Sequence, residues 1–289
     1  MMRRRSALAI AVRKPTKEII LYRETLRPAA DRLPLLKLPV LRGVVSFIEM
    51  LVVGTRALMY SANCALEEEE EELSPLQLAL MVFFSLVVGI AVFMLLPTVI
   101  MHFIQGYLPQ KTFLLSLGEG VFRLLILFSY IISIARMPDV RRVFQYHGAE
   151  HKSVHCYEAG KDLTVNNARG YSTLHPRCGT AFLLVVVFVS ILLFSLFSWR
   201  SLFQRLALRL LLLPLVAGLA YEIIRLAGKR SQNPVFRMLL APGLLMQKLT
   251  TAEPDDEQLE VALKALRAVL GFDTDNTEFN SGRNDSHAG

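Results

Sequence analysis

The residues with the clearest chemical potential are histidines, and four of the six gather in one short part of the chain. His147, His151 and His155 are spaced four residues apart, so a helix over residues 143–158 would place them in a column on one face. Glu150 follows His147 by three residues and lies close to the same face. Neighbouring imidazoles at this spacing can chelate one divalent ion together, and zinc accepts such nitrogen donors readily.

The string from His147 to His151 also matches the H-x-x-E-H pattern of inverted zinc peptidases. In that pattern two imidazoles hold the ion, and the carboxylate takes a proton from metal-bound water, whose pKa the ion lowers to about 7. We therefore expect Glu150 to act as a general base. A five-residue match is short, and the alternative is that these histidines are interfacial polar residues near lipid headgroups.

A second group follows, in which His175 and Cys178 stand three residues apart directly before an apolar segment. Imidazole and thiolate are both good zinc ligands, so the two groups can converge on one ion. Arg177 lies between them, and either Arg177 or Lys152 could stabilise an anionic intermediate. Cys156 and Glu158 are spare ligands. The predicted site is a Zn²⁺ site, or one for another divalent metal, with Glu150 and Arg177 as catalytic residues and four ligands: His147, His151, His175 and Cys178.

The composition places these residues in a membrane protein. Hydrophobic residues make up 53% of the chain and charged residues only 20%, with a mean hydropathy of +0.41. The apolar residues form long runs, and four of them are long enough to cross a hydrocarbon layer of ~30 Å: residues 76–104, 114–135, 180–199 and 206–226. The formal net charge of +7 comes mainly from residues beside these runs, which indicates contact with lipid headgroups and no nucleic-acid partner.

The remaining segments predict smaller elements around the spans. Residues 6–26 alternate apolar and polar side chains around a polar break, which predicts a β-hairpin that needs a partner surface. Residues 40–66 predict an amphipathic interfacial helix, because Arg42, Glu49 and Arg56 are spaced seven apart and share one face.

Two elements are expected after the last span. Residues 233–249 predict two short helices separated at Pro242-Gly243. Residues 252–271 predict an amphipathic helix that Gly271 ends.

The predicted fold is mainly α, a polytopic membrane helix bundle of about four spans with an N-terminal β-hairpin, an interfacial amphipathic helix and a cytoplasmic C-terminal helix. Basic residues in loop 136–177 and after the last span predict that both termini and this loop are cytoplasmic, although Arg200, Arg205 and Arg209 run against that orientation. The expected segments are 1–38 (hairpin), 39–72 (amphipathic helix and acidic linker), 73–136 (two spans), 137–179 (metal-site loop), 180–228 (two spans), 229–271 (C-terminal helices) and 272–289 (disordered tail).

Several strings in this chain resemble those of the bacterial YqhQ-like family, also called the DUF1385 family. The resemblance extends over nearly the whole chain and is carried by residues 144–152, 175–180, 60–62, 242–243, 247–251 and 253–254. It implies a multi-pass membrane protein of the bacterial inner membrane and a metal-dependent enzyme, and it implies no substrate. The family usually begins with a Gly-rich stretch, whereas this sequence begins at Met1, so any part of a site supplied by that stretch falls outside this sequence.

Three functions follow from these features. The first is a membrane hydrolase in which His147, His151 and one of His175 or Cys178 hold the ion. Its metal site lies at headgroup level, which indicates a lipid, lipid-linked or membrane-protein substrate. The second is a scaffold or assembly factor in which four ligands close a structural zinc site. The third is a transporter, which ranks last because the charged residues of the spans lie mostly near their ends.

Overall fold

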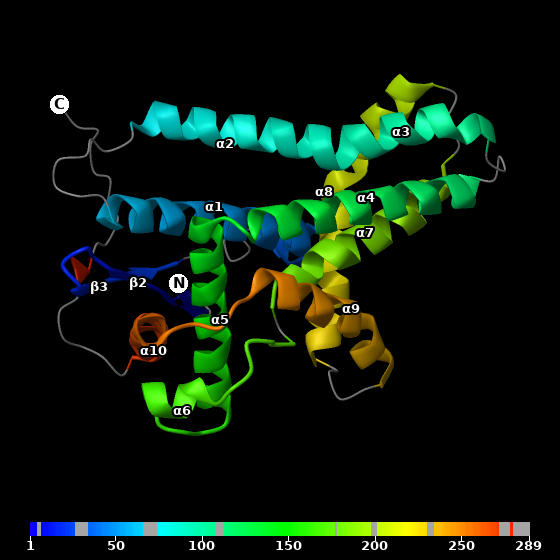
Figure 1. Cartoon of the computed structure of the whole chain (residues 1–289). Coiled ribbons are helices and arrows are strands. Elements are labelled where there is room, and N and C mark those ends of the chain that lie inside the picture. The colour runs from blue at the N-terminus through cyan, green and yellow to red at the C-terminus, as the bar shows by residue number, and fades with distance from the viewer. Residues whose placement is uncertain are drawn as a thin grey trace.

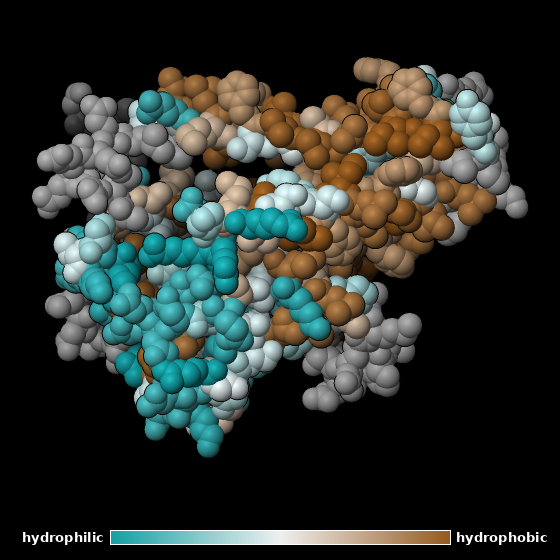
Figure 2. Space-filling model, viewed as in Figure 1, coloured by the Kyte–Doolittle hydropathy of each residue, from teal (hydrophilic) through white to brown (hydrophobic). Residues whose placement is uncertain are grey.

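A computed structural model describes residues 1–4, 7–26, 34–65, 74–107, 112–176, 178–197, 201–229, 234–271 and 278–279. The protein is mainly helical, with one small sheet at its N-terminus. A polar part holds the sheet and the helices around the histidines, and an apolar part holds the long helices (Figures 1 and 2). The predicted fold class is confirmed.

The sheet is built on the predicted hairpin, which joins β2 (Ala7–Arg13) and β3 (Ile19–Thr25) in antiparallel register. β1 (Met2–Arg4) pairs with β2 on one side, and β4 (Glu278–Phe279) runs parallel to β3 on the other. The predicted disordered tail lies outside the described residues except for β4.

Two helices cover the hairpin, one on each face. Leu8, Ile10 and Val12 of β2 pack with Ala57 of α1 (Leu41–Ala65). The β2 residues between these face α10 (Asp256–Leu270), and Ala9 packs there in one buried cluster with Ala268. Asp255 caps the start of α10, because its side chain accepts a hydrogen bond from the Gln258 amide, and Gly271 caps its end with φ 86°. The predicted C-terminal helix and the hairpin's need for a partner are both confirmed.

The charged face of α1 turns toward the rest of the protein. Arg42 donates to Glu222 of α8 (Leu202–Lys229) at 2.6 Å, and Glu49 and Arg56 form ion pairs with Arg3 and Glu24 of the sheet. Because the charged side chains of α1 pair with other parts of the protein, the surface that α1 exposes carries large apolar side chains: Ile48, Met50, Leu51, Val52 and Leu58.

The apolar bundle consists of α2 (Pro75–Ile90), α3 (Leu96–Ile104), α4 (Thr112–Ile134), α7 (Thr180–Ser195) and α8. A π-helical turn, Ala91–Leu95, joins α2 to α3 directly before Pro97, where a proline ring would crowd a regular α-helix. The helices expose many large apolar side chains, as expected for a surface that contacts lipid (Figure 2).

In the part of the chain that the structure describes, four helices are long and apolar enough to span a membrane, which agrees with the predicted number: Leu41–Cys64, Ala79–Tyr107, Leu114–Ile134 and Leu202–Ala227. One of these four helices differs from the predicted set of spans. α1 meets the criterion, whereas the apolar helix expected at 180–199 ends at Ser195 and is about 24 Å long at 1.5 Å per residue.

Short elements complete the fold. They are the 3₁₀ turns Pro34–Lys37 and Gln105–Tyr107, together with α5 (Pro138–Glu158), α6 (Val165–Arg169) and α9 (Pro234–Thr250). The prediction of two short helices after residue 233 is wrong, because α9 continues through Pro242. A proline removes one backbone hydrogen bond and does not by itself end a helix that packs on its neighbours, and α9 packs against α7 and α8.

Candidate metal centre

The helix that carries the histidine column is α5, which stands across the direction of α4 (Figure 1). It begins with Pro138, a residue suited to the first helical turn. Its small residue Ala149 and the thiol of Cys156 pack against Leu259 and Leu263 of α10. The column therefore lies away from this apolar contact, beside the segment that leads into α7.

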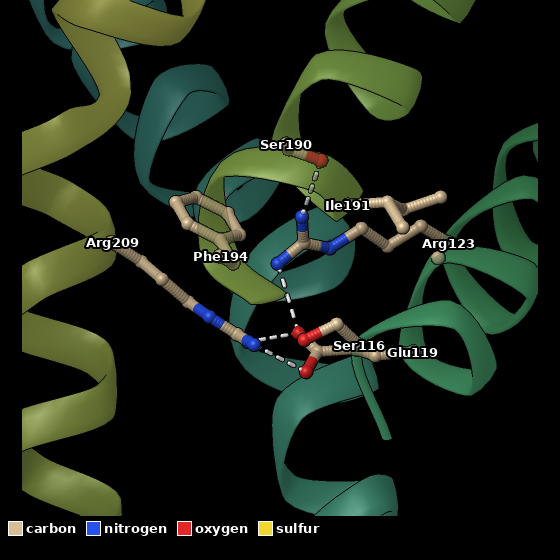
Figure 3. A pocket seen from close by; sticks show the side chains of 8 residues that line it. Ser116, Glu119, Arg123, Ser190, Ile191, Phe194 and Arg209 are labelled. Carbon is tan, nitrogen blue, oxygen red and sulfur yellow. Dashed lines mark hydrogen bonds and ion pairs between the residues drawn. The ribbon is translucent and has the colours of Figure 1, made fainter. Parts of the chain in front are cut away.

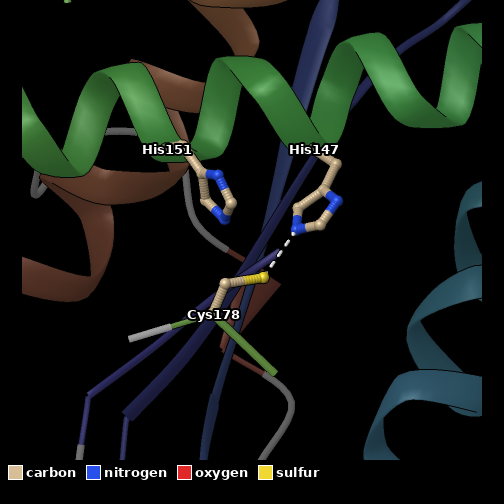
Figure 4. Close-up of side chains that lie close together, drawn as sticks. All are labelled: His147, His151 and Cys178. Atoms are coloured by element: carbon tan, nitrogen blue, oxygen red, sulfur yellow. Dashed lines mark hydrogen bonds between the residues drawn. The ribbon is translucent and has the colours of Figure 1, made fainter. Parts of the chain in front are cut away.

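The structure brings His147, His151 and Cys178 together (Figure 4). One potential ligand atom from each lies within 4.8 Å of the others, and His147 Nε2 is 3.2 Å from Cys178 Sγ. In a tetrahedral zinc site with bonds of about 2.0–2.3 Å, neighbouring ligand atoms are about 3.3–3.8 Å apart. The distance between His147 and Cys178 is close to this range, and two nitrogens and one sulfur within 4.8 Å of one another are a donor set that could hold a divalent metal. We call His147, His151 and Cys178 the metal trio.

Backbone carbonyls hold both imidazoles of the metal trio in orientation. His147 Nδ1 donates to the Thr250 carbonyl at 2.9 Å, and His151 Nδ1 donates to the Thr173 carbonyl at 2.5 Å. These bonds assign the proton to Nδ1 and leave Nε2 of each ring as the ligand atom. A partner of this kind on the second ring nitrogen is usual for histidines that bind metals.

The electrostatics of the trio favour the thiolate, which is the metal-binding form of cysteine. Burial alone raises the pKa of Cys178, but hydrogen bonds from His147 and His151 outweigh it and lower the pKa to about 5. Burial likewise disfavours a charged His147, yet its bond to Cys178 raises the pKa of this imidazole. Without a metal, the imidazole and the sulfur therefore stabilise each other as an ion pair.

Gly148 allows the chain after α9 to cross α5 beside His147. A Cβ atom at Gly148 would lie 2.2 Å from the Ala252 carbonyl oxygen, so no other residue fits without a shift of backbone. The Ala252 amide donates to the Phe144 carbonyl at 3.0 Å, which fixes this crossing. Lys152 anchors the same region, because its ammonium group contacts Glu253 at 2.7 Å.

A second group lies one turn further along α5. His155, Glu158 and His175 also place one ligand atom each within 4.8 Å of one another. His175 thus lies beside the metal trio rather than within it, and its ring centre is 5.7 Å from that of His151. Gln247 of α9 holds the His175 backbone with two hydrogen bonds, of 2.8 and 3.0 Å. Burial lowers the pKa of His175, although Glu158 opposes the effect.

The other predicted residues have different places. Glu150 is partly exposed and belongs to neither group, but its negative charge acts on His147. Arg177 lies outside the described residues. Cys156 is buried and contacts the Asp162 carbonyl, 3.4 Å from its sulfur. The sequence ranked Glu158 only as a spare ligand, although its spacing of three from His155 on one helix was a signal for a shared face.

Fold and site together define a class: a mainly helical, multi-pass membrane protein with a His/Cys centre in the polar part at one end of its apolar bundle. The chain belongs to the family described as "Protein of unknown function (DUF1385)", whose model matches residues 38–272. It is 35% identical over 247 residues to "Uncharacterized protein YqhQ" of Bacillus subtilis (strain 168), which covers 81% of this chain and 77% of that relative. No solved structure matches the chain. The predicted family resemblance is confirmed.

Proposed function

We propose that this protein is a zinc-dependent hydrolase of the bacterial inner membrane that acts on a lipid-linked or membrane substrate at the cytoplasmic face. The observation that carries the proposal is the number of converging donors. Among the described residues, three side chains form the metal trio and His175 turns to a separate group. Catalytic zinc sites keep three protein ligands and an open position, whereas structural sites close with four.

Each residue of the centre has a role under this proposal. His147, His151 and Cys178 would hold zinc, which when bound would supply Lewis acidity and a lowered pKa for water. Glu150 would accept a proton, since its charge already acts on the neighbouring His147. Arg177 would stabilise negative charge that develops on the substrate.

The place of the metal trio supports a membrane substrate. Cys178 stands two residues before α7, so the site lies where the apolar bundle begins. The charge pattern supports a cytoplasmic site, because Arg136, Arg141 and Arg142 follow α4 on this side. Arg205 and Arg209, which run against this orientation in the sequence, are buried and paired with Glu119 and do not act as loop charges.

A lipid-release assay tests the catalytic proposal. The purified full chain, loaded with zinc in nanodiscs made from a bacterial lipid extract, should release a soluble product that mass spectrometry detects. Glu150→Gln should keep its zinc and lose activity by about 100-fold or more, as expected for a general base. Glu18→Gln, an exposed control of the same chemistry, should retain full activity. Full activity in Glu150→Gln would remove the base role.

A structural zinc site is the second candidate, and one observation favours it. The metal trio connects three segments: α5, the end of α9 and the segment that leads into α7. The imidazoles of α5 donate to the carbonyls of Thr250, at the end of α9, and of Thr173, and Cys178 stands two residues before α7. The absorption spectrum of the cobalt-substituted protein separates the candidates. A spectrum that changes when azide or another small ligand is added indicates the open position of an enzyme, and an unresponsive tetrahedral spectrum indicates a structural site.

A further inference from the structure

A second buried polar cluster lies inside the apolar bundle, where the sequence indicated only scattered charges near helix ends. Glu119 of α4 accepts hydrogen bonds from Arg123 at 2.9 Å and from Arg205 at 2.7 Å. Arg209 of α8 binds the same carboxylate through both of its terminal nitrogens. Figure 3 shows Arg123 and Arg209 reaching Glu119 from different helices. We call Arg123, Arg205 and Arg209 with Glu119 the arginine cluster.

The charges of the arginine cluster do not balance. Among the described residues, three guanidinium groups meet one carboxylate, which leaves two positive charges in excess. Glu119 and Arg209 are each 1% exposed and Arg205 is 4% exposed, so water does not solvate this excess. Phe194 offers its ring to Arg123 and Arg209 at 5.5 and 5.1 Å, and Ser190 accepts from Arg123. Neutral groups of this kind stabilise a cation only partly, and unpaired charge is costly in an apolar bundle.

The guanidinium groups also have donors left over. Nε of Arg123 and Nε of Arg205 are buried and have no hydrogen-bond partner among the described residues. The groups that best satisfy several guanidinium donors at once are carboxylates and phosphates, whose oxygens accept parallel hydrogen bonds. Arg123 is the most exposed member, at 12% of its side chain, and it lies with Ser116, Ser190 and Phe194 around a narrow recess that side chains must widen to admit an anion (Figure 3).

The cluster lies near one end of the apolar bundle. Arg205 stands three residues into α8 and Glu119 seven residues into α4, which corresponds to about 5 and 10 Å from the helix starts. Ser190 is five residues from the end of α7, so the cluster lies at the end of the bundle opposite Cys178. In a membrane, the phosphate groups of lipids lie just outside the hydrocarbon layer that such helix ends reach.

From the excess charge, the unmet donors and the depth, we propose that the arginine cluster is a binding site for a phosphate-type anion. Arg123 contacts the anion and supplies specificity, and Glu119 holds the other two guanidinium groups in place. The anion is the phosphate of an anionic lipid headgroup or free phosphate, which offer the same oxygens to the same donors. This site is separate from the metal trio and does not depend on its chemistry.

The experiment uses the full chain in neutral detergent. Native mass spectrometry measures retention of phosphatidylglycerol against phosphatidylcholine, and calorimetry measures binding of inorganic phosphate. The wild type should prefer phosphatidylglycerol by about tenfold or more, and Arg123→Gln should abolish the preference. The matched control Arg225→Gln, a partly exposed arginine of α8 outside the cluster, should keep it. Binding of inorganic phosphate with the same dependence on Arg123, without a lipid preference, would identify free phosphate as the source.

Two results overturn the proposal. One is that Arg123→Gln, folded by its circular dichroism, binds both anions as the wild type does. The other needs no variant. The proposal requires that phosphatidylglycerol or phosphate raise the midpoint of thermal unfolding of the wild type above that in phosphatidylcholine at equal ionic strength. If neither anion raises it, the cluster is a structural ion network only.

Discussion

The metal trio and the arginine cluster are both buried and polar, but they are built in opposite ways. The metal trio takes two ligands from one turn of α5 and a third from Cys178, and backbone carbonyls orient its rings. The arginine cluster draws its members from α4 and α8, with Thr98 of α3 and Ser190 of α7 around them. The trio brings together electron-pair donors that could share one cation, whereas in the cluster guanidinium groups outnumber the carboxylate.

This difference is the reason why we propose different ligands for the two clusters. In the trio, the pKa of Cys178 is lowered to about 5, so this side chain is a thiolate at neutral pH. In the cluster, a single carboxylate serves three arginines. A protein of this design would bind a metal cation at one end of its bundle and an anion at the other.

The largest effect is expected from removing the carboxylate of the arginine cluster. Glu119→Ala leaves three buried guanidinium groups without their counter-charge and should destabilise the protein by about 3–5 kcal/mol. Unfolding in detergent, followed by circular dichroism, measures the loss. Asp256→Ala is the comparison, because its pair with Arg169 is more than half exposed on both sides and contributes about 0–1 kcal/mol. Equal losses in the two variants would contradict the burial of the cluster.

A smaller effect is expected at Gly148, which holds the metal trio in place. Gly148→Ala forces the Ala252 carbonyl away from α5 and should cost about 1–3 kcal/mol, together with a weaker metal affinity, because Thr250 then loses its place at His147. Competition with a zinc indicator measures the affinity. Gly179→Ala, beside Cys178 but in open space, should leave it unchanged. If both variants bind zinc equally well, the crossing does not position His147.

The smallest change is chemical and leaves the fold intact. In metal-free protein, iodoacetamide should alkylate Cys178 faster than Cys156, because hydrogen bonds lower the pKa of Cys178 whereas burial raises that of Cys156. The rate at Cys178 should stay level from about pH 8 to pH 6 and fall as the pH drops through its pKa of about 5. Mass spectrometry of peptides reports both sites, and faster labelling of Cys156 would contradict the assignment. Zinc should protect Cys178.

The sequence predicted best what depends on local spacing. Residues His147 and His151 lie on one face because helical geometry requires it, and Gly271 ends α10 as its residue type predicted. The faces of the hairpin also followed from alternation. These features need only a few neighbouring residues.

Features that depend on contacts between distant residues could not be predicted from the sequence. The arginine cluster joins positions from Thr98 to Arg209, and nothing near Glu119 indicates that Arg205 is its partner. The separation of His175 from the metal trio depends on Gln247 of α9, which fixes the backbone of that histidine. The helix α9 also continues through Pro242, because its packing against other helices outweighs the local tendency of Pro242 and Gly243 to end a helix.

The zinc content of the purified full chain, after reconstitution and removal of excess metal, tests most directly whether the metal trio is a metal centre. We expect about one tightly held zinc per chain in the wild type and in Cys156→Ser. Cys178→Ser and His147→Ala, each of which removes one member of the metal trio, should lose it while their circular dichroism remains that of the wild type. A wild type that retains no zinc, or a Cys178→Ser variant that retains as much as the wild type, would contradict the metal trio as a metal centre.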